Sequence, residues 1–411
     1  MAINAGDTAW LLISTALVML MTPALGLFYG GMVRRKNILS TIMMSFAVLA
    51  LVSVLWALYG YSLSFGTDYG GIIGGLDWLG LAGVSQQPSP IYATTVPHLA
   101  FALFQAMFAA ITVALISGAV VERVKFGALM AFSVLWLTLV YCPLAHWVWG
   151  NGGWLAKLGA LDFAGGTVVH VNAGISALAL ALLLKPRKGF KEKWLMEPNN
   201  VPMVILGTAL LWFGWFGFNA GSALTAGGLA SNAFAATNIS AASASVTWML
   251  LTWVTRRPSP LGAATGAVVG LVAITPAAGF VPPWAGIPIG AIASVLAYST
   301  MLWRLKASRI DDSLDVFACH GVGGIWGALA TGIFATAAVN TAGSGLIDGN
   351  PTQVLIQAVA IAATAAFAFT VTWTLGKLVD ITVGLRVTTE EETVGLDISQ
   401  HGERAYGEVL R

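Results

Sequence analysis

Charged side chains are scarce in this sequence, at 9% of 411 residues, and cysteine occurs only twice. With 57% hydrophobic residues, the composition excludes an ordinary soluble globular domain. The formal net charge of +2 is too small to indicate a nucleic-acid-binding protein. Cys142 and Cys319 both fall inside apolar stretches, so we expect no disulfide framework, no metal cluster and no cofactor.

Long apolar runs dominate what remains. A helix needs about 20 apolar residues to cross roughly 30 Å of hydrocarbon. The first run starts almost at Met1 without a basic leader, so we expect a retained helix rather than a cleaved signal. The sequence therefore predicts an all-α polytopic membrane protein, with a transmembrane domain over 1–384 and a solvated cytoplasmic tail over 385–411. The eleven predicted spans lie near 7–33, 38–65, 97–121, 126–149, 163–185, 201–222, 232–255, 260–281, 284–303, 316–337 and 352–383.

Basic residues are confined almost entirely to the connections that follow odd-numbered spans. Cytoplasmic loops carry an excess of lysine and arginine, so this alternation predicts a multi-pass cell-membrane protein with its N-terminus outside and its C-terminus inside. The intervening loops contain almost only Lys157. The residues concerned are Arg34, Arg35, Lys36, Arg123, Lys125, Lys185, Arg187, Lys188, Lys191, Lys193, Arg256, Arg257, Arg304, Lys306 and Arg309.

Two histidines occupy matching positions in the two halves of the chain. His170 follows Asp162 by eight residues in the fifth span, and His320 follows Asp312 by eight residues in the tenth. Five spans separate them, so the two helices enter from opposite sides, which predicts two five-helix halves of inverted topology plus an eleventh helix. Eight residues at about 1.5 Å each bring both imidazoles near the midplane, where they can meet.

A lone histidine in a span could equally be a satisfied core residue. An ionisable group inside a membrane is costly and normally faces the protein interior or a pathway. Two histidines at matched depth favour a functional role. They are the only midspan histidines, and no zinc-protease motif, phosphate-binding loop or nucleophile elbow accompanies them, so we expect no enzyme.

Aromatic residues and one hydroxyl gather at the predicted outer side. Phe104 and Phe108 lie four apart on one helical face, Trp149 ends the fourth span, and Phe218 and Ser222 end the sixth. Aromatic faces attract cations, and a hydroxyl accepts a hydrogen bond from an N–H donor. Each aromatic alone could be an ordinary interfacial or packing residue, whereas the set predicts a vestibule for a small cation that donates hydrogen bonds.

Two further residues have alternative interpretations. Asp162 could be a cation ligand at the entrance, but a helix N-terminal carboxylate more often caps free N–H groups, and we favour that structural role. Thr275 precedes Pro276 and predicts a break in the eighth span. The freed backbone groups there could line a cavity, or the break could be a kink without function.

With these residues in place, the chain resembles the ammonium transporter family (Amt/Mep/Rh), most closely its prokaryotic Amt branch. The resemblance runs essentially end to end, with mild departures at Ala106 and Met107 around the gate. The matching runs are GLFYGGMVRRKN (26–37), AHWVWG (145–150), GALDFAGGTVVHVNAG (159–174), GWFGFNAGSA (214–223), TPAAG (275–279), DVFACHGVGGIWG (315–327) and GLDISQHGERAY (395–406).

The resemblance implies roles for each candidate residue. Trp149, Phe108 and Ser222 would recruit ammonium, with Phe104 nearby. Phe108 and Phe218 would form a stacked gate, His170 and His320 the twin-histidine pair, Asp162 the entrance aspartate and Thr275 a residue near the inner pore. The implied assembly is a homotrimer, with a PII-type signalling protein as a cytoplasmic partner. The resemblance also implies that the C-terminal tail over 385–411 is regulatory.

The expected function is transport of ammonium or ammonia across the lipid bilayer. An apolar lumen is expensive for a bare ion, so we expect deprotonation at the vestibule and passage of ammonia past the histidines, with net charge movement. The alternatives are an electroneutral ammonia channel, or an ammonium sensor that acts through a partner.

Overall fold

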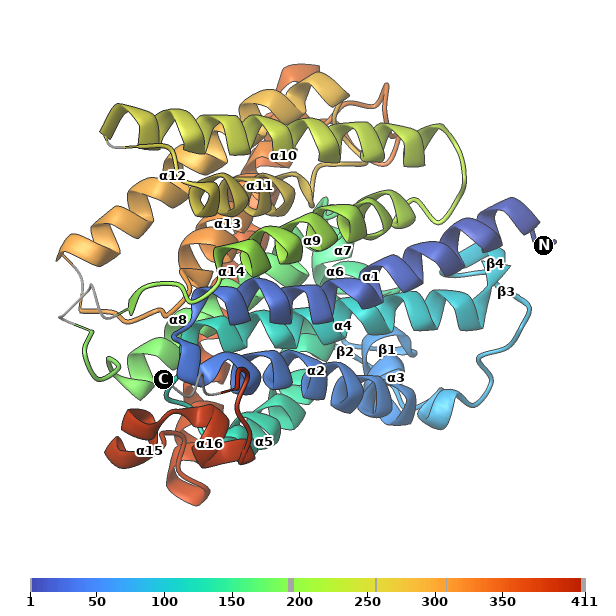
Figure 1. Cartoon of the computed structure of the whole chain (residues 1–411). Coiled ribbons are helices and arrows are strands. Elements are labelled where there is room, and N and C mark those ends of the chain that lie inside the picture. Colours follow the sequence, from blue (N-terminus) through green and yellow to red (C-terminus); the bar gives the residue numbers. More distant parts are fainter. Residues whose placement is uncertain (1, 191–195, 256, 308, 408–411) are drawn as a thin grey trace.

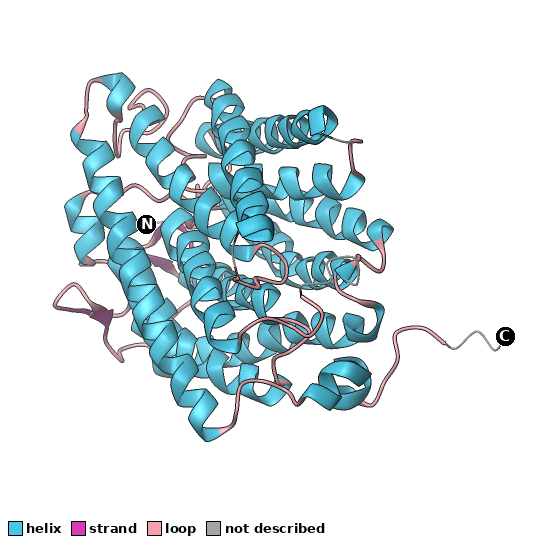
Figure 2. Ribbon diagram, turned by 90° about the vertical axis from the view of Figure 1, so that its left-hand side faces the viewer, coloured by secondary structure: helices cyan, strands magenta, loops and turns pink. Residues whose placement is uncertain are grey.

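The computed structural model describes residues 2–190, 196–255, 257–307 and 309–407. Lys191, Lys193 and Arg256 of the basic-loop pattern lie outside these residues. The described chain is almost entirely helical, with only short strands (Figure 2). Figure 1 shows the long helices running roughly side by side, which makes one bundle.

Eleven helical segments of the described chain follow the predicted spans, several of them assembled from an α-helix and a π-helical turn. The second span joins α2 to α3 through Trp56–Gly60, and the fourth joins α5 to α6 through Leu137–Tyr141. The α-helices of the bundle are α1 (Ala5–Met32), α2 (Ile38–Leu55), α3 (Tyr61–Phe65), α4 (His98–Val120), α5 (Phe126–Trp136), α6 (Cys142–Trp149), α8 (Asn172–Leu184), α9 (Val201–Gly221), α10 (Gly228–Thr255), α11 (Pro260–Ile274), α12 (Gly286–Ala307), α13 (Gly323–Phe334) and α14 (Thr352–Thr382).

The remaining elements are short and lie in the connections. β1 (Asp68–Tyr69) pairs with β2 (Ile73–Gly74), and β3 (Pro88–Ser89) pairs with β4 (Ala93–Pro97), both antiparallel. α7 (Trp154–Leu158) precedes the fifth span, while α15 (Thr389–Val394) and α16 (Leu396–His401) lie in the tail.

The predicted fold class is confirmed. Among the described residues, ten helical segments are long and apolar enough to cross a membrane. The one remaining segment of the described chain is α11, the eighth span, which has 15 residues. It is shorter than predicted, because the helix ends at Ile274 and Thr275–Phe280 continues as turns. Pro276 lacks the N–H that a continuing helix would need, which explains the break predicted there.

The bundle has two dissimilar ends. We call "the basic face" the end at which α1 and α4 finish and the tail lies, at the left of Figure 1. Arg34, Glu122 and Arg187 follow α1, α4 and α8 there, and Arg304 lies in the last turn of α12. We call "the loop face" the opposite end, with the N-terminus and the four short strands.

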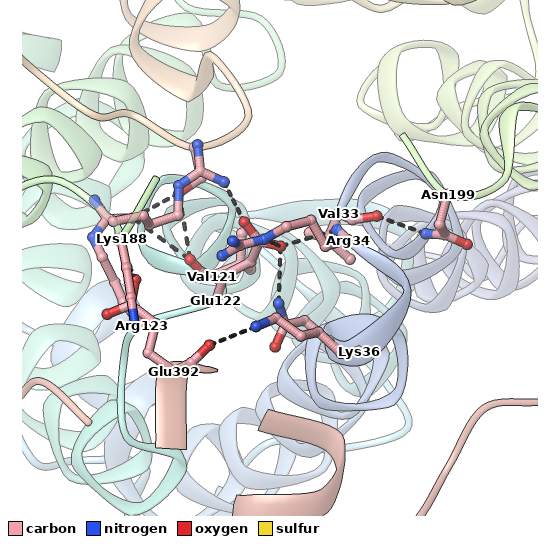
Figure 3. Close-up of polar contacts among 12 residues, drawn as sticks. Val33, Arg34, Lys36, Val121, Glu122, Arg123, Lys188, Asn199 and Glu392 are labelled. Atoms are coloured by element: carbon pink, nitrogen blue, oxygen red, sulfur yellow. Dashed lines mark hydrogen bonds and ion pairs between the residues drawn. The ribbon is translucent and has the colours of Figure 1, made fainter. Parts of the chain in front are cut away.

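A buried ion-pair network joins four connections at the basic face, and Figure 3 shows its part around Glu122 and Arg34. Glu122 Oε1 accepts from Arg34 Nε and Asn37 Nδ2, each at 2.9 Å, while Glu122 Oε2 pairs with Arg187. Arg187 also binds both carboxylate oxygens of Asp311. Burial raises the pKa of Glu122, but the charges of Arg187 and Arg34 outweigh it and lower the pKa to about 2. The network therefore carries permanent charges that hold the connections together.

The tail is docked on this network, so the prediction of a solvated appendage is wrong. Leu396 and Asp397 are buried, and Asp397 Oδ1 accepts from Ser40 N at 2.8 Å at the start of α2. Glu392 accepts from Lys188 N at 2.6 Å and from Arg386 Nη2 at 2.8 Å. The polar residues of the tail are thus partners of the connecting loops.

Candidate functional site

The two midspan histidines meet in the centre of the bundle. His170 Nδ1 and His320 Nδ1 are 3.2 Å apart, and the rings are stacked with their centroids at 5.3 Å. Both side chains are almost completely buried. A hydrogen bond at this distance requires one Nδ1 to carry a proton and the other to accept it, so the pair shares a proton position along the line between the rings.

Each histidine sits on a π-helical turn that begins its span. His170 belongs to Gly166–Val171, and His320 to Phe317–Val322. Five residues before each histidine the backbone is left-handed, with φ 114° at Gly165 and φ 56° at Asp315. The repeat predicted from the eight-residue spacing therefore extends to the backbone conformation.

The approach of the two histidine-bearing helices is fixed by glycine. A Cβ placed on Gly174 would lie 2.1 Å from Gly321 N, and a Cβ on Gly324 would lie 3.0 Å from His170 Cβ. Side chains at these positions would force the helices apart. Small residues let membrane helices pack backbone against backbone, and here this contact places the imidazoles within hydrogen-bond range.

Asp162 caps the span that carries His170. Its Oδ1 accepts from Gly165 N and Gly166 N, and its Oδ2 accepts from Thr167 N, Thr167 Oγ1 and Val168 N. These five donors occupy the carboxylate, which is only 8% exposed. The structure thus places Asp162 as a helix cap, and Trp149 Nε1 donates to its backbone carbonyl at 2.9 Å.

The predicted vestibule residues lie next to one another above His170. Phe108 and Phe218 are stacked, with ring centroids 4.2 Å apart. Phe104 and Trp149 each contact Phe108 edge to face, at 4.9 Å and 6.0 Å. Ser222 lies one helical turn beyond Phe218, to whose carbonyl its hydroxyl donates at 2.8 Å. The neighbours Ala106 and Met107 on α4 are both buried.

Sequence reasoning missed Trp215, which lies directly against the histidine pair. Its indole stacks on the His170 ring at 5.5 Å, and Trp215 lies 5.5 Å from the Phe218 ring. The signal was its position three residues before Phe218, which puts both on one face of α9. Thr275 lies behind it, where the threonine hydroxyl accepts from Trp215 Nε1 at 2.9 Å.

Two cavities of very different size adjoin the histidines. On the Phe218 side, a cavity of about 10 Å³ is lined by apolar residues together with His170, His320 and Trp215. This is close to the minimum needed for one water-sized molecule. On the other side, a cavity of about 500 Å³ runs from the basic face, where Arg34, Glu122 and Arg187 line it, to His320. We call the larger cavity the basic vestibule. The histidine pair is therefore open to a wide cavity on the side of the basic face, while the stacked rings of Phe108 and Phe218 close the opposite side.

Comparison with known proteins identifies the family of the chain. The model of the Ammonium Transporter Family matches residues 9–406. The chain is 52% identical to the ammonium transporter Amt1 of Archaeoglobus fulgidus, over 98% of this chain and 99% of that protein.

Solved structures give the same result. The crystal structure of Saccharomyces cerevisiae Mep2 matches with a TM-score of 0.88 and 37% identity, covering 94% of this chain and 88% of that one. A structure described as a sensor Amt protein matches with a TM-score of 0.88 and 30% identity, covering 96% and 98%. The chain belongs to the ammonium transporter family.

Proposed function

We propose that this protein is a transporter, not an enzyme, and that it carries ammonium across the cell membrane by stripping its proton and conducting ammonia past His170 and His320. The observation that carries the proposal is the imidazole pair, joined at 3.2 Å, between a stacked aromatic closure and an open vestibule. Ammonium is drawn to the face of Trp149 and Phe108, and Ser222 accepts one of its N–H bonds.

The orientation of the protein follows from its basic connections. Positive loops stay in the cytoplasm, so the basic face is the inner side and the loop face is the outer side. The vestibule of Phe104, Phe108, Trp149 and Ser222 then faces the exterior, and the docked tail is cytoplasmic.

Selectivity against potassium arises from chemistry rather than size. The lumen between Phe218 and His320 offers few groups that could replace a hydration shell, and a bare ion in such surroundings is costly. Ammonium can leave its proton behind and cross as neutral ammonia, but potassium cannot. Asp162 supports the entrance indirectly, by fixing the turn that carries His170, and Thr275 acts through Trp215.

The histidines offer a route for the released proton. A neutral imidazole can accept on one nitrogen and donate from the other. His170 Nε2 has no hydrogen-bond partner among the described residues, which leaves it open to an entering donor. Transfer along the pair moves the proton inward with ammonia, so each cycle carries net positive charge.

The test is electrical. Purified protein in liposomes on a supported membrane receives an ammonium jump and then a potassium jump. We expect a transient current for ammonium alone, abolished in His170→Ala and His320→Ala and retained in His401→Ala in the tail. Alkalinisation of the lumen without current would support the neutral channel, and unchanged currents in both pore variants would refute the role of the histidines.

Two features of assembly are part of the same proposal. We expect a homotrimer with one pore per subunit, measurable by the mass of the detergent complex. We also expect a PII-type signalling protein to bind the basic face. The likeness to a sensor Amt protein favours one second candidate, ammonium sensing through such a partner. A sensor would bind the PII-type partner to an extent that depends on the external ammonium concentration, and would show no ammonium flux.

A further inference from the structure

The corresponding aspartates of the two halves of the repeat differ in how many hydrogen bonds they accept. Asp162 and Asp312 each precede a pore histidine by eight residues, and each accepts from the amide five residues ahead, Thr167 N and Phe317 N, at 2.7 Å. Asp162 accepts five hydrogen bonds, whereas Oδ1 of Asp312 has no partner among the described residues.

The surroundings of Asp312 suit a carboxyl that exchanges a proton. The side chain is completely buried, and a free carboxylate oxygen in such a place is costly unless it is protonated. Burial chiefly, and then the negative charge of Asp315, raise the pKa of Asp312 to about 6, against the opposing charge of Arg304. The charged or titratable groups near it include the adjacent Asp311 together with Asp315, Arg304, Arg123, Tyr29 and Cys319.

Asp312 adjoins residues that line the basic vestibule, although its own side chain is not among the lining residues. Asp315 lines that cavity, its carboxylate accepts from Arg304 Nε at 2.7 Å, and its N–H points to the Asp312 carbonyl at 3.5 Å. Ser313 and Leu314, which lie between the two aspartates in the chain, and Cys319, which follows them, line the vestibule as well. His320 lines the same cavity, at the end away from the basic face.

We propose that Asp312 is the group that binds the transported proton at the inner end of the pore and returns it to ammonia in the basic vestibule. This rests on the proposed function, because it requires a proton to travel with ammonia. Hydrated protons from the histidine side convert the carboxylate to the acid. The O–H bond of that acid then breaks, its proton goes to ammonia, an N–H bond forms and the carboxylate is restored. Both carboxylate oxygens of Asp162 already accept hydrogen bonds from the start of its own helix.

The first experiment observes the proton without transport. Infrared difference spectra of the reconstituted protein between pH 5 and pH 8 should contain a carboxylic-acid C=O band that titrates near pH 6. The band should be absent in Asp312→Asn and present in Asp348→Asn, which alters an exposed aspartate on the loop face. A band that persists in Asp312→Asn would overturn the proposal.

A second variant tests the proposal even if Asp312→Asn does not fold. Asp315→Asn removes a negative neighbour and frees Arg304, and both changes favour the carboxylate of Asp312. We expect the midpoint of the band to move down by at least one pH unit. An unmoved midpoint would contradict the assignment, whether or not Asp312→Asn folds.

Transport measurements then separate this proposal from the function beneath it. The ammonium current of the wild type should vary with inner pH between 5 and 8, and Asp312→Asn should reduce the current at least fivefold and flatten that dependence. Wild-type-like current and pH dependence in Asp312→Asn would refute the relay alone. Absence of ammonium current in the wild type would instead refute the proposed function, while the infrared titration would still stand.

Discussion

Thr275 holds Trp215 against His170: the Thr275 hydroxyl accepts from the indole Nε1 at 2.9 Å, and the indole ring stacks on the imidazole of His170. The same hydroxyl donates to Leu271 O at 2.7 Å, so its orientation is fixed. Thr275 in the eighth span thereby fixes the position of the indole that packs on His170, without itself donating a hydrogen bond to either histidine.

We expect Thr275→Val to impair transport through this contact. Valine keeps the shape but leaves a buried indole N–H without an acceptor, at a cost of about 1–3 kcal/mol. Ammonium current should fall severalfold, with a lower thermal unfolding temperature. Thr275→Ser keeps the hydroxyl and should behave like the wild type; equal loss in the serine variant would mean that packing, and not the hydrogen bond, is responsible.

The buried network at the basic face should give the protein an acid-sensitive stability. The pKa of Glu122 is about 2, below its ordinary value of 4.5. A depressed pKa contributes stability that is present above about pH 4.5 and is lost as the pH falls toward 2. The thermal unfolding temperature of the protein in detergent should therefore fall as the pH is lowered from 4.5 to 2.

Glu122→Gln tests the same network at neutral pH. It leaves Arg34 and Arg187 with less charge compensation, and breaking a buried pair costs about 3–5 kcal/mol. The variant should unfold at lower temperature at pH 7, and its stability should change less between pH 4.5 and 2 than that of the wild type. A wild-type unfolding temperature would show that the network adds nothing.

Asp162→Asn should loosen the turn that carries His170. The amide group of asparagine presents N–H donors where Thr167 N and Val168 N now find an oxygen, so buried donors lose their acceptor at a cost of about 1–3 kcal/mol. Hydrogen–deuterium exchange of residues 159–174 should accelerate. Asp77→Asn, an exposed carboxylate of the loop face, is the control and should leave that segment protected.

The docked tail should be released by a single change. Glu392→Gln removes the charge that binds Lys188 N and Arg386, so trypsin should cut after Arg386 severalfold faster than in the wild type. Glu390→Gln, on the same short helix but exposed, is the matched control. Equal cleavage of the two variants would show that other contacts hold the tail.

The spans, the repeat and the meeting of the histidines could be predicted because they follow from simple periodicities. Apolar length determines a span, and an equal spacing from Asp162 to His170 and from Asp312 to His320 determines equal depth. Thr275 before Pro276 likewise predicted the end of α11. These features depend on local sequence and on membrane thickness alone.

The contacts between distant segments could not be predicted in the same way. Arg34 and Arg187 were interpreted as markers of orientation, and nothing in their loops indicates that they share Glu122. The tail is polar, which suggested solvation, but its polar groups are the acceptors for Lys188 and Ser40. Trp215 was missed because an aromatic residue in an apolar span looks like packing until its neighbour is known.

The contact of Gly174 with Gly321 makes the spacing of the two histidines independent of the side chains that line the neighbouring cavities. The spacing of the imidazoles is set by main chain against main chain, so it is insensitive to which side chains fill the cavities on either side. Substitutions among the residues that line the two cavities can then change the size and charge of those cavities while the spacing of the two histidine-bearing helices stays the same. One scaffold can in this way serve different solutes without rebuilding its chemistry.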